Sequence, residues 1–261
     1  VVEPEDATDK SVAWSSSNEA VAIVSATGLV TAKGDGAATI TVTTNSGGFT
    51  DSIKVIVGPF LTITGDGIGK TTYFSLTELS NWKSERPNAW VGPRVYSTIN
   101  TWPSKKWYAA EGVKLTALLQ EAQIKGSARL IKVKSVDGYV MTFTKKELLD
   151  DTRYYFPNFK EGGGDGDGHI PGSPVGKEPV EAIIALRSVE NSDNFGYMNE
   201  LNCPLLVLGQ RAVTEQTNHT FVKNVGEIEV LTEPPSKWAA PVANQPAGEV
   251  PVGTEVVLTN Q

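Results

Sequence analysis

The chain has 261 residues, and this size alone predicts two or three domains. Its formal net charge of −7 argues against nucleic acid or an anionic membrane surface as the main partner, because either would favour a basic face. The one cysteine, Cys203, excludes an intrachain disulfide framework and a cysteine-rich zinc site. The apolar runs fall well short of the roughly 20 residues that a membrane-spanning helix needs.

The first segment of the chain alternates apolar with small or polar side chains, which is the period of a half-buried β-strand. Val21 and Ile23 show this alternation in one predicted strand. Ala38, Ile40 and Val42 show it in another. Glycines separate the runs where the chain must reverse, at Gly28, Gly34 and Gly36. Short strands at this spacing predict a β-sandwich.

Three motifs in the same segment resemble the bacterial immunoglobulin-like domain of group 2. They are Trp-Ser-Ser-Ser-Asn at residues 14–18, Val-Ala-Ile-Val at residues 21–24 and Gly-Leu-Val-Thr-Ala-Lys-Gly at residues 28–34. The resemblance covers residues 1–58 and implies an all-β sandwich that serves as a spacer or adhesive unit in secreted or surface-attached bacterial proteins. Because the opening strands of the family should precede Val1, we expect a truncated first domain, exported by a signal outside this fragment.

The Gly-Pro pair at residues 58–59 predicts a domain boundary. Beyond it, Ser75 stands three residues before Glu78, a capping-box spacing that predicts the start of a short helix. Apolar residues at helical spacing predict a second helix over residues 113–122. Strands are predicted at residues 61–64, 130–135, 139–143, 182–186, 205–208 and 227–231, with a hairpin turn at residues 137–138. Residues 59–233 should therefore form an α+β domain in which strands dominate.

The order of these segments resembles the sulfite-oxidase-like molybdopterin-binding domain. The resemblance rests on Trp107 followed by Gly-Val-Lys-Leu at residues 112–115, on Asp-Gly-Tyr at residues 137–139, and on Lys223 before the closing strand. It implies a molybdopterin cofactor whose molybdenum is held by a cysteine thiolate, a soft ligand. The corresponding stretch, residues 95–102, has no cysteine, and Leu206 stands where the family has a phosphate-pairing arginine. We therefore expect a scaffold without metal chemistry and without a bound cofactor.

The same segment is rich in tryptophan, which suggests a ligand-binding cleft. Its candidate residues are Arg94, Ser97, Asn100, Trp102, Trp107 and Lys223. Aromatic faces beside hydrogen-bonding groups suit a sugar or an aromatic ligand. The alternatives are ordinary packing of the aromatic side chains in the core and, for Lys223, an exposed strand lysine.

A glycine-rich stretch at residues 162–169 carries Asp165 and Asp167, whose oxygens make them candidate calcium ligands. The alternative is a solvent-exposed insertion, since so many glycines oppose ordering.

Residues 234–261 resemble the start of the β-repeat that follows chitobiase-type hexosaminidases, and are too short to form a core. The sequence as a whole predicts a non-catalytic fragment of a bacterial surface or secreted modular protein. Its predicted role is display, adhesion or binding of an extracellular ligand, either a glycan or a protein. Two alternatives stay open: a molybdopterin-dependent oxidoreductase that ligates metal through Ser97 or Asn100, and a carbohydrate-binding module.

Overall fold

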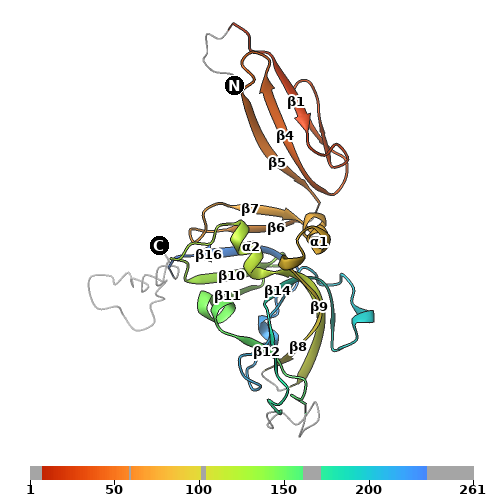
Figure 1. Ribbon diagram of the computed structural model, residues 1–261, viewed down its shortest axis with the longest axis vertical. Coiled ribbons are helices and arrows are strands. Elements are labelled where there is room, and N and C mark those ends of the chain that lie inside the picture. Colours follow the sequence, from red (N-terminus) through yellow and green to blue (C-terminus); the bar gives the residue numbers. More distant parts are fainter. Residues whose placement is uncertain (1–7, 59, 101–103, 161–171, 234–261) are drawn as a thin grey trace, which may run out of the picture.

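A computed structural model of the chain describes residues 8–58, 60–100, 104–160 and 172–233. In this part of the chain β-strands dominate, and the two α-helices are short (Figure 1). A small all-β module lies at one end of the long axis, and a larger body carries the remaining strands and both helices. This mostly β architecture agrees with the predicted immunoglobulin-like sandwich and with the strand-rich character predicted for the second domain.

The first module contains two small antiparallel sheets. The larger has the strand order β1-β4-β5, formed by β1 (Val12–Ser16), β4 (Gly36–Thr44) and β5 (Thr50–Val57), and the smaller pairs β2 (Ala22–Val24) with β3 (Val30–Ala32). Its buried core is small and consists of Val21, Ala22, Ala38 and Ile40. The predicted alternation is therefore confirmed at Ala38 and Ile40, whereas Val42 is half-buried. In the other predicted strand, Val21 is buried but lies just before β2, and Ile23 is half-buried.

The recurrent motifs of this module contact one another. Gly28 has φ +82°, a left-handed conformation that favours glycine, and a Cβ there would lie 2.8 Å from the Trp14 ring. Asn18 closes the turn after β1, because its backbone carbonyl accepts from the N–H groups of Val21 and Ala22. The tryptophan, the asparagine and the glycine thus shape one end of the same small core.

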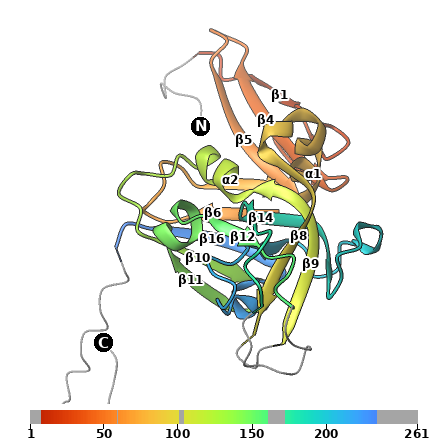
Figure 2. The same cartoon turned by 60° about the horizontal axis from the view of Figure 1, so that its bottom comes forward.

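A defined joint connects the module to the body. The Lys54 ammonium donates to the Tyr73 carbonyl at 2.7 Å and pairs with the Glu78 carboxylate at 3.0 Å. Glu78 belongs to α1 (Leu76–Glu85), which also contacts β4 (Figure 2). Gly58 turns the chain into the body with φ +90°, and a Cβ there would lie 2.6 Å from Asp35.

The body is built on two main sheets. The five-stranded sheet has the order β11-β10-β16-β6-β7, formed by β6 (Phe60–Thr64), β7 (Thr72–Ser75), β10 (Leu130–Ser135), β11 (Val140–Thr144) and β16 (Val225–Leu231). The four-stranded sheet has the order β15-β14-β9-β8, formed by β8 (Trp90–Ile99), β9 (Lys105–Lys114), β14 (Ile183–Glu190) and β15 (Leu205–Val207). A separate pair joins β12 (Arg153–Tyr155) to β13 (Glu178–Val180). All of these pairings are antiparallel except that of β6 with β16.

The helical segments of the body are all short. Besides α1, they are α2 (Leu115–Glu121), the 3₁₀ turns η1 (Pro87–Ala89), η3 (Phe195–Tyr197) and η4 (Asn218–Thr220), and the single π-helical turn η2 (Lys146–Asp150). None of the helices in the described part of the chain has the length and hydropathy of a membrane-spanning segment.

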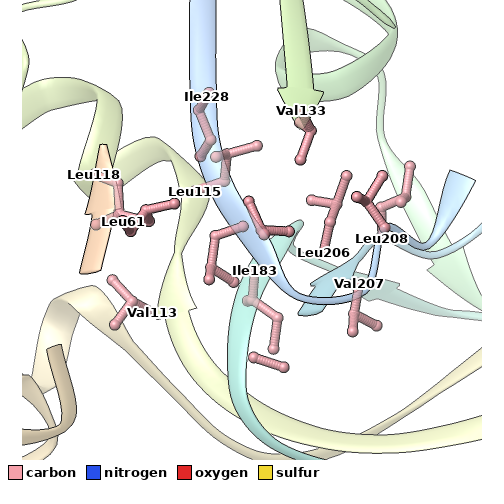
Figure 3. Packing of buried hydrophobic residues seen from close by; sticks show 14 of the residues in the cluster. Leu61, Val113, Leu115, Leu118, Val133, Ile183, Leu206, Val207, Leu208 and Ile228 are labelled. Atoms are coloured by element: carbon pink, nitrogen blue, oxygen red, sulfur yellow. The ribbon is translucent and has the colours of Figure 1, made fainter. Parts of the chain in front are cut away.

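The main core of the body lies between the two sheets and α2 (Figure 3). Its labelled residues come from both sheets and from α2: Leu61, Val113, Leu115, Leu118, Val133, Ile183, Leu206, Val207, Leu208 and Ile228. Each of these side chains is essentially inaccessible to solvent. Because full burial of one such side chain contributes about 1.5–3 kcal/mol, this core supplies the main stabilisation of the body.

Most of the elements predicted for the body are confirmed. Ser75 caps α1, since its Oγ accepts from the Glu78 N–H at 3.0 Å, as the capping-box spacing predicts. The predicted hairpin is formed by β10 and β11 around Gly138, which has φ +94°. The second predicted helix is shorter than expected, because Val113 and Lys114 still belong to β9 and continue its pairing with β14.

Candidate functional site

The β8–β9 hairpin positions most of the predicted site residues. Its two ten-residue strands pair in a register that sets Ser97 opposite Trp107 and Ile99 opposite Lys105. Side chains alternate between the two faces of a strand, so these four residues share one face of the hairpin and Lys106 lies on the other.

Ser97 is fully buried and has a structural hydrogen bond. Its side chain is 0 % exposed, and its Oγ accepts from the Phe156 N–H at 3.0 Å. This bond anchors the segment after β12 to β8. The Ser97 oxygen is therefore engaged within the protein.

Asn100 stabilises the end of the same hairpin. Its Oδ1 accepts from the Ser104 N–H at 2.8 Å, and the two backbones are also hydrogen bonded. Trp102, the residue predicted beside it, lies outside the described residues.

Trp107 lies at the edge of a small second core. We call this core the hairpin cluster, and it comprises Ile99, Phe156 and Phe159 with Trp107, Tyr154 and Val213 packed against them. The Trp107 ring meets Phe159 edge-on, with centroids 5.4 Å apart, and the Lys160 ammonium lies 4.3 Å from the ring centroid. The indole Nε1 is buried, and no described residue accepts a hydrogen bond from it.

Arg94 and Lys223 line two different cavities. The Arg94 guanidinium donates to the Pro179 carbonyl at 3.0 Å and borders a cavity of about 460 Å³ beside β13. Lys223 pairs with Glu190 at 2.9 Å and borders a cavity of about 250 Å³ near Tyr108. The structure thus brings Ser97, Asn100 and Trp107 to one hairpin and leaves Arg94 and Lys223 apart from them.

Glu190 is the most perturbed carboxylate of this region. Burial raises its pKa, but hydrogen bonds from Lys106 and Lys223 outweigh burial and lower the pKa to about 2. Tyr108 lies beside it, and burial together with the Glu190 charge raises the pKa of the Tyr108 hydroxyl far above its usual range. Lys106 and Lys223 therefore both neutralise the Glu190 carboxylate. The alternative in which Lys223 is an ordinary exposed lysine did not predict this pairing.

Glu111 is a candidate that sequence reasoning missed. Its side chain is buried at 1 % exposure, and its carboxylate pairs with Lys83 at 2.9 Å and Arg187 at 3.0 Å. It borders a cavity of about 510 Å³ that Trp90 and Cys203 also line. The signal available in the sequence was an acid inside the apolar run of residues 108–113, where an unpaired charge would be strongly unfavourable.

The described residues do not fit a molybdenum ligand set. Cys203 lies in the cavity next to Glu111, with its Sγ 3.4 Å from the Ser188 Oγ, and burial raises the pKa of its thiol. Cys203 is thus not part of residues 95–102, the stretch in which the resemblance places the metal ligand, and residues 101–102 of that stretch lie outside the described part of the chain. In β8 itself, the Ser97 oxygen accepts a backbone hydrogen bond.

The calcium hypothesis falls outside the part of the chain that the structure covers, since Asp165 and Asp167 are not among the described residues. Within the described ranges, no group of three or more His, Cys, Asp or Glu side chains is arranged to hold a metal ion.

Comparison with known proteins bears on the first module. Residues 1–55 match the family model of the bacterial Ig-like domain (group 2). A stretch of 58 residues is 52 % identical to an alpha-L-arabinofuranosidase of Bifidobacterium longum subsp. longum, which corresponds to 22 % of this chain and 5 % of that protein. The immunoglobulin-like resemblance of the first module is thereby confirmed. The sulfite-oxidase-like and chitobiase-type resemblances receive no support from these comparisons and stay predictions.

Proposed function

We propose that this chain is a non-catalytic part of a modular bacterial protein, secreted or held at the cell surface, in which the body binds or displays an extracellular ligand. The observation that carries the proposal is the match of residues 1–55 to a bacterial Ig-like domain of group 2. The arabinofuranosidase relative shares only 5 % of its own length with this chain, so its activity does not enter the proposal.

The joint between the module and the body supports a display role. Lys54 links β5 to both β7 and α1, through the Tyr73 carbonyl and the Glu78 carboxylate. A spacer that holds its neighbour through such contacts presents the body at a defined angle. An exposed ion pair of this kind contributes about 1 kcal/mol at most, and contacts of β4 and β5 with α1 and β7 complete the joint.

The polar groups of β8 and of the residue that follows it support the non-catalytic part of the proposal. Ser97 and Asn100, the two oxygen ligands that an oxidoreductase alternative would need, both accept hydrogen bonds from backbone N–H groups. Ligation of a metal by Ser97 would compete with its bond to the Phe156 N–H, and ligation by Asn100 would compete with the bond that stabilises the end of the hairpin. We therefore propose that the body binds no molybdopterin.

Elemental analysis of the full chain tests this proposal. The protein is produced in a molybdenum-competent host, beside a Ser97→Ala variant and an Asn100→Ala variant. We expect far less than stoichiometric molybdenum and tungsten in all three proteins. Stoichiometric metal in the unaltered protein, lost in either variant, would establish the oxidoreductase alternative instead.

A carbohydrate-binding role is the second alternative and depends on the tryptophans. Three of the described tryptophan rings already carry a cation from this chain. Lys83 lies 5.7 Å from the Trp90 ring centroid, Arg86 lies 4.5 Å from that of Trp82, and Lys160 lies 4.3 Å from that of Trp107. Cations at these rings compete with a stacked sugar. Glycan-array screening of the unaltered chain beside a Trp102→Ala variant tests this alternative. Equal retention of both proteins on the array would show that Trp102 does not stack on a bound sugar.

A further inference from the structure

A buried lysine without a partner stands at the start of β9. Lys105 is 3 % exposed, and its ammonium makes no hydrogen bond with any described residue. Lysine is rarely buried without a counter-charge, because transfer of an ammonium out of water costs several kcal/mol. Such a group calls for a specific explanation.

Apolar side chains lie beside Lys105 on its face of the hairpin. Its cross-strand partner is Ile99, a member of the hairpin cluster, and Trp107 follows two residues later on the same face of β9. The two aromatic rings of Phe156 and Phe159 complete the buried part of this cluster.

Trp107 adds a second unused donor on that face. Its indole N–H is buried without an acceptor among the described residues, and its backbone lies about 7 Å from that of Lys105, the separation of alternate residues in a strand. The Lys160 ammonium lies 4.3 Å from the centroid of the same indole ring. One face of β9 therefore carries two buried donors, one of them charged, and both need an acceptor.

Two carboxylates among the described residues of this region are already paired. Lys106, on the opposite face, pairs with Glu190 at 2.7 Å. Glu215 directs its carboxylate to Arg211 at 2.7 Å and to Arg153 at 3.6 Å. Neither acid is available to neutralise Lys105.

We infer that Lys105 and Trp107 form a binding site for an oxyanion, whose oxygens accept from the ammonium and from the indole N–H. The site suits a carboxylate, sulfate or phosphate group. Such an anion has at least two oxygens, so one can accept from the charged Lys105 ammonium and another from the neutral Trp107 indole N–H. Because both donors are buried, the anion is small or is the terminal group of a larger ligand. The inference names the chemical class of ligand within the binding role proposed above.

Nuclear magnetic resonance of the full chain tests the site directly. The ¹⁵N-labelled protein gives indole N–H signals from its tryptophans, and a Trp107→Phe variant identifies the Trp107 signal. The protein is titrated separately with phosphate, sulfate and acetate against sodium chloride of equal ionic strength and pH. We expect the Trp107 signal to shift downfield and to saturate with at least one oxyanion, and the three titrations to separate carboxylate from phosphate and sulfate ligands.

Two lysine variants make the result specific. Lys105→Met should abolish the saturable shift, whereas Lys106→Met, the matched change on the opposite face, should retain it. Lys105→Met should also melt no lower than the unaltered chain in chloride, because it removes an unpaired buried charge. At 100 times the dissociation constant, the bound anion should raise the melting temperature of the unaltered chain by roughly 5 °C or more and leave that of Lys105→Met unchanged.

Several outcomes would overturn the site. The first is the absence of a saturable shift with all three oxyanions, which is the result expected if water bridges the buried donors. The second is a shift that persists in Lys105→Met. The third is a lower melting temperature of Lys105→Met than of the unaltered chain in chloride. These outcomes are independent of the metal analysis above, so the oxyanion site and the non-catalytic assignment can fail separately.

Discussion

The cap of α1 makes a sharp prediction about the stability of the body. Ser75 is 1 % exposed, and its Oγ accepts the Glu78 N–H at 3.0 Å, so Ser75→Ala leaves a half-buried backbone donor without this partner. Loss of an N-cap costs about 1 kcal/mol, within a range of roughly 0.5–2 kcal/mol. For a body of this size we therefore expect the melting temperature to fall by roughly 2–6 °C.

A serine in the same helix gives the matched control. Ser80 is exposed, and its Oγ donates to the Leu76 carbonyl one turn earlier at 2.9 Å. Because alanine is the better residue in a helix interior, Ser80→Ala should leave stability unchanged or raise it by about 0.5 kcal/mol. Differential scanning calorimetry of the two variants beside the unaltered chain measures both effects. Equal melting temperatures for Ser75→Ala and Ser80→Ala would refute the capping argument.

The remaining predictions concern a close backbone approach, a carboxylate and the joint. Gly112→Ala should destabilise the body by more than about 3 kcal/mol in urea unfolding, because its Cβ would lie 2.2 Å from the Ile184 carbonyl oxygen. Gly92→Ala is the control and should be nearly neutral, because a Cβ at Gly92 meets no atom within 4 Å. Similar unfolding midpoints for the two variants would contradict the tight β9–β14 contact. The pKa of Glu190 is depressed to about 2 from 4.5, so its pairing stabilises the fold above about pH 4.5 and this contribution is lost as the pH falls toward 2. Glu190→Gln should therefore flatten the acid limb of a stability–pH profile recorded by thermal melts, and an unchanged limb would exclude the pairing as its source. Lys54→Met should broaden the distribution of distances between module and body in small-angle scattering without lowering the melting temperature of the body, and an unaltered distribution would show that other contacts hold the joint.

Local signals in the sequence were sufficient for much of the fold. The Ser75 cap depends on residues three apart, and the β10–β11 hairpin depends on a glycine that tolerates a positive φ, so both could be predicted without knowledge of the rest of the chain. The start of the second helix could not be predicted in this way. Val113 and Lys114 have helical spacing with the residues that follow, but the ladder between β9 and β14 extends through both of them.

The candidate site was less accessible to sequence reasoning, because burial of a polar group depends on residues far away in the chain. Ser97 looked available as a ligand, yet its partner is the backbone of Phe156, which lies 59 residues further on. Glu111 similarly obtains its two cations from α1 and β14. The orphaned ammonium of Lys105 could be recognised only once the neighbours on its face of β9 were known.

The parallel pairing of β6 with β16 has a mechanical consequence. These are the first and last strands of the body, with Thr62 opposite Glu227 and Thr64 opposite Glu229, and a 2.6 Å hydrogen bond from Thr64 to Glu227 lies alongside the ladder. Tension applied where β6 enters and β16 leaves would act at opposite ends of this ladder and load its evenly spaced hydrogen bonds in shear, all at once rather than one after another. A body anchored in this way would resist stretching when its flanking segments are pulled apart by flow or by contact with a surface.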